Sequence, residues 1–418
     1  MSNSHLPVDI YSNFNALVKN VTEGGDHDFS TEKVVTIGQA AQIYGYENTL
    51  NKLSVAMGNT LIAVRPYRSR FGLIEQSPEE WGQFARKISY YSGEFEKSQD
   101  YQVSGATNLA DGQAVDHYAI KKRYPLEVWF GGMKVLQKHY TRFRKQLKVS
   151  FSNAEDFARF YEGEVMQINN EIQMLKELEN RAVVLNMAAA CIRGVNTTVV
   201  SRKFPAGMAR NMTAEYNAKY GTTYTTKELL TVHLKEFTGF FAGVLKYQSD
   251  LLAQATTLYH VIPKNVKGDG DATLTLWRHT PKEDQRLMLN SSVLYDMETT
   301  VYPEIFHDGY LRLDQYEAVP FWSDVTDPLN LSVKAINTLN PTTGLSDTLS
   351  TPDAGEKTVL GIMFDKWACG THYRQEDVVT TPVNAAGDYY NTYYHWAKDY
   401  RNDLTENIVV FYMSDTAA

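Results

Sequence analysis

The most regular hydrophobic pattern of the chain lies near its middle. Apolar residues recur at spacings of three and four over residues 161–192, which places them on one face of an α-helix. Ser152 followed by Glu155 matches a capping box at the start, and Gly194 supplies a stop. The pattern predicts one helix over residues 153–193, on the order of 60 Å long at 1.5 Å per residue. A rod several times the average helix length suits a shell subunit or a coiled coil better than a compact enzyme.

The residues before this helix follow a different pattern. Residues 1–33 are polar, which predicts a flexible or extended arm. Over residues 68–124 glycine, serine and glutamine recur, and short alternating pieces such as Lys87–Tyr91 replace any helical period. We predict a long β-hairpin excursion whose side chains contact something outside their own domain. An unstructured loop is the alternative, although one of this length is unusual within a compact domain.

The residues after the long helix predict a mixed domain followed by a closing strand pair. Helical periodicity covers Glu228–Thr256, whereas Arg286–Asp296 and Thr358–Asp365 are typical of strands. Turn-forming residues dominate 337–353 and predict surface loops. The aromatic segment Tyr389–Met413 predicts a hairpin that returns to the first domain. The fold class expected from these elements is α+β.

Composition narrows the class of protein. The chain has 418 residues, of which 43% are hydrophobic, and this is globular rather than disordered composition. Its 41 Lys and Arg against 49 Asp and Glu leave a formal charge of −8, which argues against a dedicated nucleic-acid binder. Two cysteines exclude a disulfide framework and favour folding in a reducing cytosol. Neither a secretory signal nor a membrane-spanning apolar stretch is expected.

Tyrosine is unusually frequent among the aromatic residues. The chain has 27 tyrosines against 18 phenylalanines. A tyrosine side chain joins a large apolar face to a hydroxyl group, so it suits half-wet interfaces as well as cores. The excess therefore indicates contact surfaces.

Charge is segregated around the start of the long helix. Six basic residues and no acidic residue lie between Trp129 and Ala154, and seven acidic residues follow within Glu155–Glu179. A solvated basic face, nucleic-acid contact and complementary contact between copies of the chain all remain open. Nucleic-acid contact is the weakest of these, because only Tyr140 and Phe143 interleave the basic residues. Adjacent opposite charges favour head-to-tail association.

Motifs of catalytic or metal-binding chemistry are missing from the sequence. It contains no phosphate loop, dinucleotide glycine fingerprint, paired-histidine zinc motif or nucleophile elbow. Lys267–Asp271 has two carboxylates between glycines but lacks the calcium-loop spacing, so it predicts a hairpin turn. We therefore predict no catalytic residue, no cofactor and no metal ion.

The order of these segments resembles the major capsid protein of tailed bacteriophages, which has the Hong Kong 97-like fold. Three stretches carry the resemblance, which is nearest to short-tailed and gut-phage members. Residues 122–194, beginning KRYPLEVWFGG, are similar to the entry into the spine helix of the family. Residues 278–290, RHTPKEDQRLMLN, resemble a turn that leads into a central strand, and residues 389–411 resemble the aromatic C-terminal strands. Specificity comes from the order of these stretches, since none of them is a catalytic motif.

The resemblance implies a division of the chain into the parts of that fold. These are an N-terminal arm (1–65), an extended β-hairpin loop (66–124), a peripheral domain with the spine helix (125–195), an axial domain (196–371) and a return to the peripheral domain (372–418). It also implies a structural, non-enzymatic protein that self-assembles into an icosahedral shell enclosing double-stranded phage DNA.

The resemblance also implies partners and a location. Many copies of the chain itself would be the main partner, together with a portal protein and a decoration or minor capsid protein. Only a short polar stretch precedes Val34, where members with a built-in scaffold carry a long helical segment, so a separate scaffolding protein is expected. Packaged DNA would be held without sequence-specific binding, since a strongly basic interior would grip it. The expected location is the virion capsid, assembled in the bacterial host cytoplasm without a membrane.

We predict that contacts between copies use aromatic residues of the excursion and charged residues near the start of the long helix. These are Trp81, Phe84, Tyr90, Tyr91, Tyr101, Lys138, Arg142, Arg144, Glu162 and Glu171. Two alternatives remain beside the phage capsid. An encapsulin-like compartment shell would share the fold, although such proteins are usually shorter. A carbohydrate-active enzyme would use the aromatic excess, but no acid and base pair for it can be identified.

Overall fold

The computed structural model describes most of the chain beyond its first 64 residues. The described residues are 65–76, 86–92, 112–114, 116–118, 120, 125–130, 134–143, 154–196, 202–263, 275–300, 316–333, 336–339, 346–348 and 352–415. The chain divides into two compact units. Unit 1 comprises residues 1–68, 137–175 and 376–395, and unit 2 comprises residues 69–136, 176–375 and 396–418.

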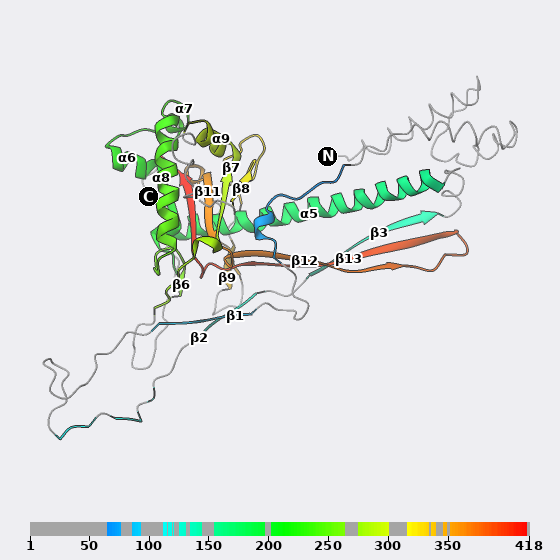
Figure 1. Ribbon diagram of the computed structural model, residues 1–418, viewed down its shortest axis with the longest axis horizontal. Helices are drawn as coiled ribbons and strands as arrows, with labels where there is room; N and C mark the ends of the chain where they lie inside the picture. The colour runs from blue at the N-terminus through cyan, green and yellow to red at the C-terminus, as the bar shows by residue number, and fades with distance from the viewer. Residues whose placement is uncertain are drawn as a thin grey trace. The chain divides into compact units, whose positions relative to one another are not determined.

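A five-stranded mixed sheet forms the centre of unit 2 (Figure 1). Its order is β5 (Ala209–Asn211), β14 (Ile408–Met413), β11 (Thr358–Asp365), β7 (Gln285–Asn290) and β8 (Tyr316–Val319). The three inner strands are antiparallel, with Ile362 opposite both Val410 and Met288, and the two edge strands run parallel to their neighbours. Every residue of β14 is buried, as expected for an apolar strand covered on both faces.

Helices cover both faces of this sheet and divide the core in two. On one face lie α6 (Met212–Tyr220), α7 (Thr226–Thr231), α8 (Leu234–Leu252) and α9 (Ser291–Thr300), as Figure 1 shows. On the other lies the second half of α5 (Ala154–Asn196), from Val183 to Ile192. Alternate side chains of β14 point to opposite sides. Val409 and Phe411 pack with the first group of helices, and Val410 and Tyr412 pack with α5.

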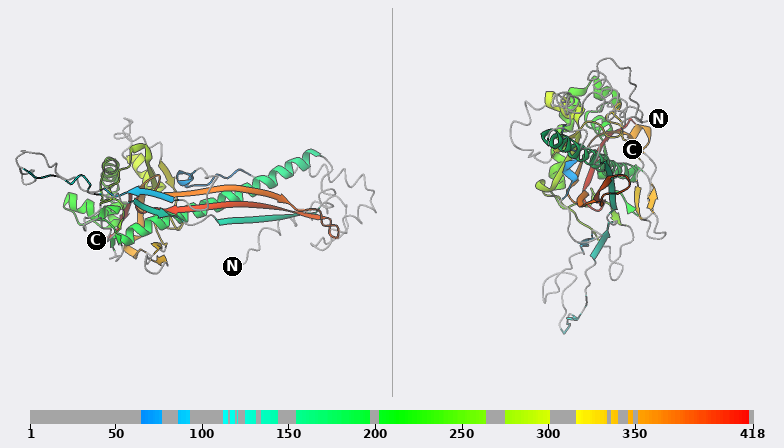
Figure 2. Two further views of the ribbon diagram at one scale, coloured as in Figure 1. Left: turned by 90° about the horizontal axis from the view of Figure 1, so that it is seen from below. Right: turned by 90° about the vertical axis from the view of Figure 1, so that its right-hand side faces the viewer.

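Unit 1 is held together by polar and aromatic contacts between strands and the first half of α5. A three-stranded sheet has the order β12 (Cys369–Thr380), β13 (Tyr389–Asn402) and β3 (Lys134–Phe143), and Figure 2 shows β12 and β13 side by side. The rings of His139 and Tyr393 stack with centroids 5.1 Å apart. The hydroxyl of Tyr140 donates to Glu171 on α5, with 2.6 Å between the oxygens. The elements α5, β12 and β13 contribute residues to both units.

Short elements complete the described chain. The antiparallel pair β1 (Arg86–Tyr90) and β2 (Pro125–Trp129) joins a strand inside the predicted excursion to a strand just after it, and the pair belongs to unit 2. Two further strand pairs are β4 (Arg202–Lys203) with β6 (Ile262–Pro263), and β9 (Ile336–Leu339) with β10 (Ser346–Thr348). Single 3-10 turns are η1 (Gly72–Ile74), η2 (Ala206–Met208), η4 (Lys282–Asp284) and η5 (Ala354–Glu356). No helix in the described part of the chain is both long enough and apolar enough to span a membrane.

Several sequence predictions are confirmed. The long helix is α5, with 43 residues, and the strands predicted at Thr358–Asp365 and within the last aromatic segment are β11 and β14. The helix predicted over Glu228–Thr256 is present as two helices, α7 and α8, with a break at His233. The His233 ring stacks on that of Tyr224, with 4.0 Å between the ring centroids. The turn predicted at Lys267–Asp271 lies outside the described residues. The predicted domain bounds stay a prediction.

The strand predicted at Arg286–Asp296 is wrong in its second half. The strand β7 ends at Asn290, whose side-chain oxygen accepts a hydrogen bond from the backbone N–H of Ser292 at 3.0 Å. A side chain of this kind caps a helix, and α9 begins at the next residue. Two predicted loops, 337–353 and 66–124, also differ from the structure. The predicted surface loop 337–353 contains residues of β9 and β10, and Phe71 and Ile74, inside the predicted loop 66–124, lie in the core of unit 2.

The predicted closing hairpin over Tyr389–Met413 is also wrong. Its two strands, β13 and β14, lie in different sheets, where β13 pairs with β12 and β3 and β14 pairs with β11 and β5. The physical reason is burial, because β14 is apolar on both faces and needs a central position, whereas the side chains of β13 are mostly half-buried.

Truncation of a residue at the centre of the core tests this architecture. Phe411 is fully buried in β14, and its ring meets that of Phe241 on α8 at 5.6 Å. We expect Phe411→Ala to lower the free energy of unfolding by roughly 3–5 kcal/mol, through lost burial and the cavity left behind. Chemical denaturation of the full chain measures this. The exposed Val325 is the matched control, since Val325→Ala should change the value by less than about 0.5 kcal/mol. Equal losses in the two variants would contradict the assignment of β14 to the core.

Candidate functional site: the charged base of the β1–β2 hairpin

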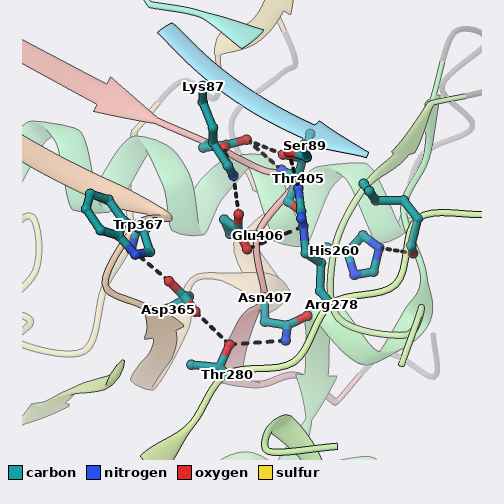
Figure 3. Close-up of polar contacts among 12 residues, drawn as sticks. Lys87, Ser89, His260, Arg278, Thr280, Asp365, Trp367, Thr405, Glu406 and Asn407 are labelled. Carbon is teal, nitrogen blue, oxygen red and sulfur yellow. Dashed lines mark hydrogen bonds and ion pairs between the residues drawn. The ribbon is translucent and has the colours of Figure 1, made fainter. Parts of the chain in front are cut away.

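A buried polar cluster joins the β1–β2 hairpin to the rest of unit 2 (Figure 3). Four segments supply it. They are β1, residues 275–280 before β7, the end of β11 with the turn after it, and the turn 403–407 between β13 and β14. These segments are distant in the sequence, so only the fold brings their charges together.

Lys87 is the residue of the hairpin that reaches into this cluster. Because side chains alternate along β1, Lys87 and Ser89 point inward while their neighbours face solvent. The Nζ atom of Lys87 lies 2.5 Å from Oδ2 of Asp403 and also pairs with Oε1 of Glu406. The exposed fraction of the side chain is 23% for Lys87, 1% for Asp403 and 10% for Glu406. The cluster therefore holds two carboxylates and an ammonium group largely out of water.

Arg278 is the second cation of the cluster, and it bridges the hairpin and the turn. Its Nη2 donates to Oγ of Ser89 at 2.8 Å, and its Nε donates to the carbonyl oxygen of Thr405 at 3.0 Å. Its Nε also lies 3.4 Å from Oε2 of Glu406. Below it, the backbones of Ser92 and Thr275 exchange hydrogen bonds of 2.8 and 3.3 Å. Side-chain and backbone contacts together therefore fix the base of the hairpin.

The charges of this cluster are balanced, and their balance matters because they are buried. Burial raises the pKa of Glu406, and the nearby Lys87 and Arg278 oppose that rise. Removing one partner from a buried ionic group costs roughly 3–5 kcal/mol, since it leaves the other charge uncompensated. The cluster thus ties the position of the hairpin to the integrity of the turn 403–407.

A chain of hydrogen bonds continues the cluster toward the sheet. Asn407 donates through Nδ2 to Oγ1 of Thr280 at 3.2 Å, and that hydroxyl donates to Oδ2 of Asp365 at 2.8 Å. The backbone N–H of Trp367 donates to the other oxygen of Asp365 at 2.8 Å. Asp365 ends β11 and Asn407 precedes β14, so this chain connects the two central strands to the charged cluster.

His260 is the buried titratable group beside this network (Figure 3). It is fully buried, and its Nε2 donates to the carbonyl oxygen of Leu276 at 2.9 Å. Burial lowers the pKa of His260 to about 4, despite the opposing hydrogen bond to Leu276. The folded protein therefore holds this imidazole neutral near pH 7.

The outer face of the hairpin is a second feature of the site. Arg86 lies opposite Trp129 and Ile88 lies opposite Glu127, so alternate residues of both strands share one exposed face. Apolar side chains occupy much of it, with Ile88, Tyr90 and Trp129 exposed to 47%, 62% and 59%. Arg86 pairs with Glu127, and its guanidinium lies 5.2 Å from the centre of the Trp129 ring. Clustered apolar exposure of this kind marks interaction surfaces.

The predicted contact residues fall into three groups. Tyr90 lies on the exposed face of the hairpin, whereas Tyr91 is half-buried and burial raises its pKa. Lys138 pairs with Glu171, and Arg142 pairs with Glu164 at 3.0 Å, so these cations meet carboxylates of their own chain. Glu162 is exposed, and the remaining residues, Trp81, Phe84, Tyr101 and Arg144, lie outside the described part of the structure. Their role between copies stays a prediction.

Sequence reasoning missed the charged cluster itself. The alternation of residues 86–90 was visible and predicted a strand, but it did not say what Lys87 and Ser89 face. The acids Asp403 and Glu406 stand in a short polar stretch that is typical of an exposed turn. Among the described residues, no group of histidine, cysteine and acidic side chains is arranged to hold a metal ion. Burial raises the pKa of both cysteine thiols, which makes them poor nucleophiles.

Comparison with known proteins places this architecture. The family described as Phi29-like phage major capsid protein matches residues 134–412. No curated protein sequence matches the chain. Among solved structures, a chain of the capsid of Staphylococcus phage Andhra is similar at a TM-score of 0.52 and 12% identity, covering 85% of this chain and 87% of that one. A chain from the structure of the head fiber and inner core protein of bacteriophage P68 is similar at a TM-score of 0.50 and 12% identity. The match covers 86% of this chain and 87% of that one. At this identity the likeness concerns the fold alone.

The buried histidine predicts how stability depends on pH. The folded pKa of His260, about 4, lies below the unfolded value of 6.5, so the unfolded chain binds the extra proton between these values. Stability from this group is present above pH 6.5 and is lost as the pH falls toward 4, by up to about 3 kcal/mol. Glu406, whose pKa is raised, acts in the opposite direction. The quantity to measure is therefore the difference between the wild type and His260→Gln.

Denaturation of the full chain between pH 7 and pH 4 provides that comparison. The variant should be the less pH-dependent of the two, since glutamine can keep a donor for Leu276 but does not titrate. Circular dichroism at pH 7 confirms that the variant is folded. Parallel loss of stability in both proteins would show that His260 is not held neutral by the fold.

Proposed function

The chain belongs to the Phi29-like phage major capsid protein family, and from this premise we propose that the outer face of the β1–β2 hairpin binds a neighbouring copy in the shell. The chain is a structural shell protein of a phage capsid with the Hong Kong 97-like fold, and it associates with itself. Its place is the virion capsid. The comparisons give no support to the compartment-shell alternative.

The observation that carries this proposal is the two-sided character of the hairpin. Its inner face is bound to its own subunit through Lys87 and Ser89, whereas its outer face presents Ile88, Tyr90 and Trp129 to solvent. Burying an apolar side chain of this size contributes about 1.5–3 kcal/mol. In a protein that associates with itself, another copy of the chain is the partner available to cover this exposed face. A closed shell repeats each contact many times, so each one can be weak.

The charged pair on the same face orients the neighbouring copy in the contact. Arg86 and Glu127 pair with each other on this face, where Arg86 lies opposite Trp129 and Glu127 lies opposite Ile88. Charges at the rim of an interface contribute mainly to specificity and to the rate of association. We therefore assign orientation of the neighbour to this pair and affinity to the apolar side chains.

The wider setting of the shell extends the proposal. We propose an icosahedral arrangement that encloses double-stranded DNA without sequence-specific binding, in keeping with the formal charge of −8. A separate scaffolding protein, a portal protein and a decoration or minor capsid protein are the further partners that we expect. The family is one of structural capsid proteins, and we propose that the chain turns over no substrate.

A double substitution on the outer face tests the contact. Ile88→Ser with Trp129→Ser changes exposed side chains only, so the subunit should stay soluble and folded. Loss of their burial should weaken each contact between copies at least tenfold, which corresponds to about 1.4 kcal/mol. Negative-stain electron microscopy and sedimentation then show subunits in place of shells, with a scaffolding protein supplied to both samples.

A matched control separates this effect from general loss of surface apolarity. Val232, between α7 and α8, is also exposed, and Val232→Ser should leave shell formation unchanged. Shells of normal yield from the double variant would overturn the proposed contact. Loss of the folded subunit would instead show that the outer face stabilises its own chain.

A further inference from the structure

A groove between α6 and α8 of unit 2 shares no residue with the hairpin or with the charged cluster. It is open to solvent and has a volume of about 870 Å³. Sites for small ligands usually measure roughly 300–1,000 Å³. We infer that this groove binds an acidic oligosaccharide, whose sugar rings lie on exposed tyrosine rings and whose carboxylate pairs with lysine side chains.

Two glycines of α8 leave the floor of the groove uncovered. Gly239 and Gly243 are four residues apart in the helix, so they share one face, and both line the groove. A side chain added at either position would meet no other atom within 4 Å. Glycine in a helix interior is less stable than alanine, so the packing of the subunit itself gives no reason for either glycine. The floor is therefore open to a flat group such as a sugar ring.

Aromatic side chains form the walls of the groove. Tyr220 on α6 and Tyr247 on α8 line it, and they are 51% and 62% exposed. Phe240 lies in the same lining, and its ring meets that of Tyr220 edge-on with 6.1 Å between the centroids. A tyrosine ring offers an apolar face beside a polar hydroxyl. The C–H face of a sugar ring matches such a surface, while the sugar hydroxyls reach the polar groups around it.

The composition of the lining favours a sugar over a peptide. Val244 is the one aliphatic residue among the described residues that line the groove, and the others are aromatic, charged or glycine. A groove that takes an amphipathic helix of another protein binds the apolar face of that helix through a hydrophobic lining. Aromatic rings set among hydrogen-bonding groups suit a ligand that is covered with hydroxyl groups instead.

A buried tyrosine leaves one hydrogen bond for a ligand to complete. Tyr216 lines the groove and is only 5% exposed, and no residue in the described part of the chain forms a hydrogen bond with its hydroxyl. Burial raises the pKa of Tyr216, and the nearby Glu236 carboxylate adds to the rise, so the hydroxyl stays protonated near pH 7 and is able to donate. Buried polar groups are normally paired. An oxygen atom of a ligand in the groove would supply the missing acceptor.

The cations of the groove determine the charge of the ligand. Lys219 and Lys235 both line it, and within the described residues neither is paired with a carboxylate. The ammonium group of Lys219 lies 5.3 Å from the centre of the Tyr220 ring and 5.2 Å from that of Phe240, so it stands beside the aromatic wall. A carboxylate on a sugar resting against this wall gains a charge-assisted hydrogen bond. Glu236 remains as an acceptor for sugar hydroxyls.

Titration of the full chain with trigalacturonic acid tests the inference, with maltotriose as the neutral trisaccharide. Isothermal titration calorimetry is carried out on purified subunits and on assembled shells. We expect saturable binding of the acidic sugar in both samples, and binding of maltotriose that is weaker by about tenfold or more, because it lacks the charge-assisted contact. Lys219→Gln should bring the affinity for trigalacturonic acid close to that for maltotriose.

Two variants of the groove and one matched control locate the site. Gly243→Leu places a side chain in the open floor and introduces a better helix former, so it should fold and should weaken binding by about tenfold or more. Tyr247→Ala removes an exposed ring and should also weaken binding by about tenfold or more. Tyr295 on α9 is similarly exposed, at 59%, and Tyr295→Ala should leave the affinity unchanged.

Three results would overturn the inference. The first is no saturable binding to the wild type, or equal affinity in the wild type and both groove variants, which would place the sugar elsewhere on the surface. The second is binding of a glutamate-rich helical peptide, blocked by Gly243→Leu, without binding of the trisaccharide, which would identify a surface for another protein. The third is binding by subunits but not by shells, which would show that a neighbouring copy covers the groove. Circular dichroism establishes that each variant is folded.

Discussion

The burial of β14 on both faces is the constraint on which the rest of unit 2 depends. A strand with Val409 and Phe411 on one side and Val410 and Tyr412 on the other can lie only in the middle of a covered sheet. Its central position carries the preceding turn, residues 403–407, into the interior as well. That turn is polar, and polar groups taken out of water need partners. Lys87, Arg278 and Thr280 are those partners.

The hairpin owes its place to this requirement. A two-stranded ribbon is marginally stable by itself in water, so β1 and β2 need an attachment. The attachment is polar because the turn that they meet is polar, and the apolar side chains of β1 are consequently left on the opposite face. An exposed apolar face promotes aggregation of a monomeric protein, but it can serve as a contact surface in a protein that binds copies of itself. If the proposed contact forms, the cluster of charges links the stability of the subunit to its association.

Much of the fold could be predicted where a long hydrophobic pattern is compatible with only one type of secondary structure. The helix α5 was visible because its apolar period persists over many turns, and β11 and β14 were visible as apolar runs. The errors lie where a local pattern is compatible with two structures. The run from Arg286 to Asp296 has apolar residues on both sides of a short polar stretch, 290–292, and the cap supplied by Asn290 makes its second half α9. The pairing of β13 with β14 was expected from their closeness in sequence, and their different burial decided against it.

The sequence by itself determined the long helix, the apolar central strands, the absence of a catalytic motif and the resemblance to a capsid protein, because each depends on residue type and spacing along one segment. It also predicted Tyr90 as a contact residue, and the structure shows that this side chain is exposed, while the contact itself stays a prediction. Only the tertiary structure decided that Lys87 meets Asp403 and Glu406, that His260 is buried beside them and that Trp129 stands exposed. Electrostatic energy and burial depend on distances in space, and residues 87 and 403 become neighbours only when the central sheet has formed.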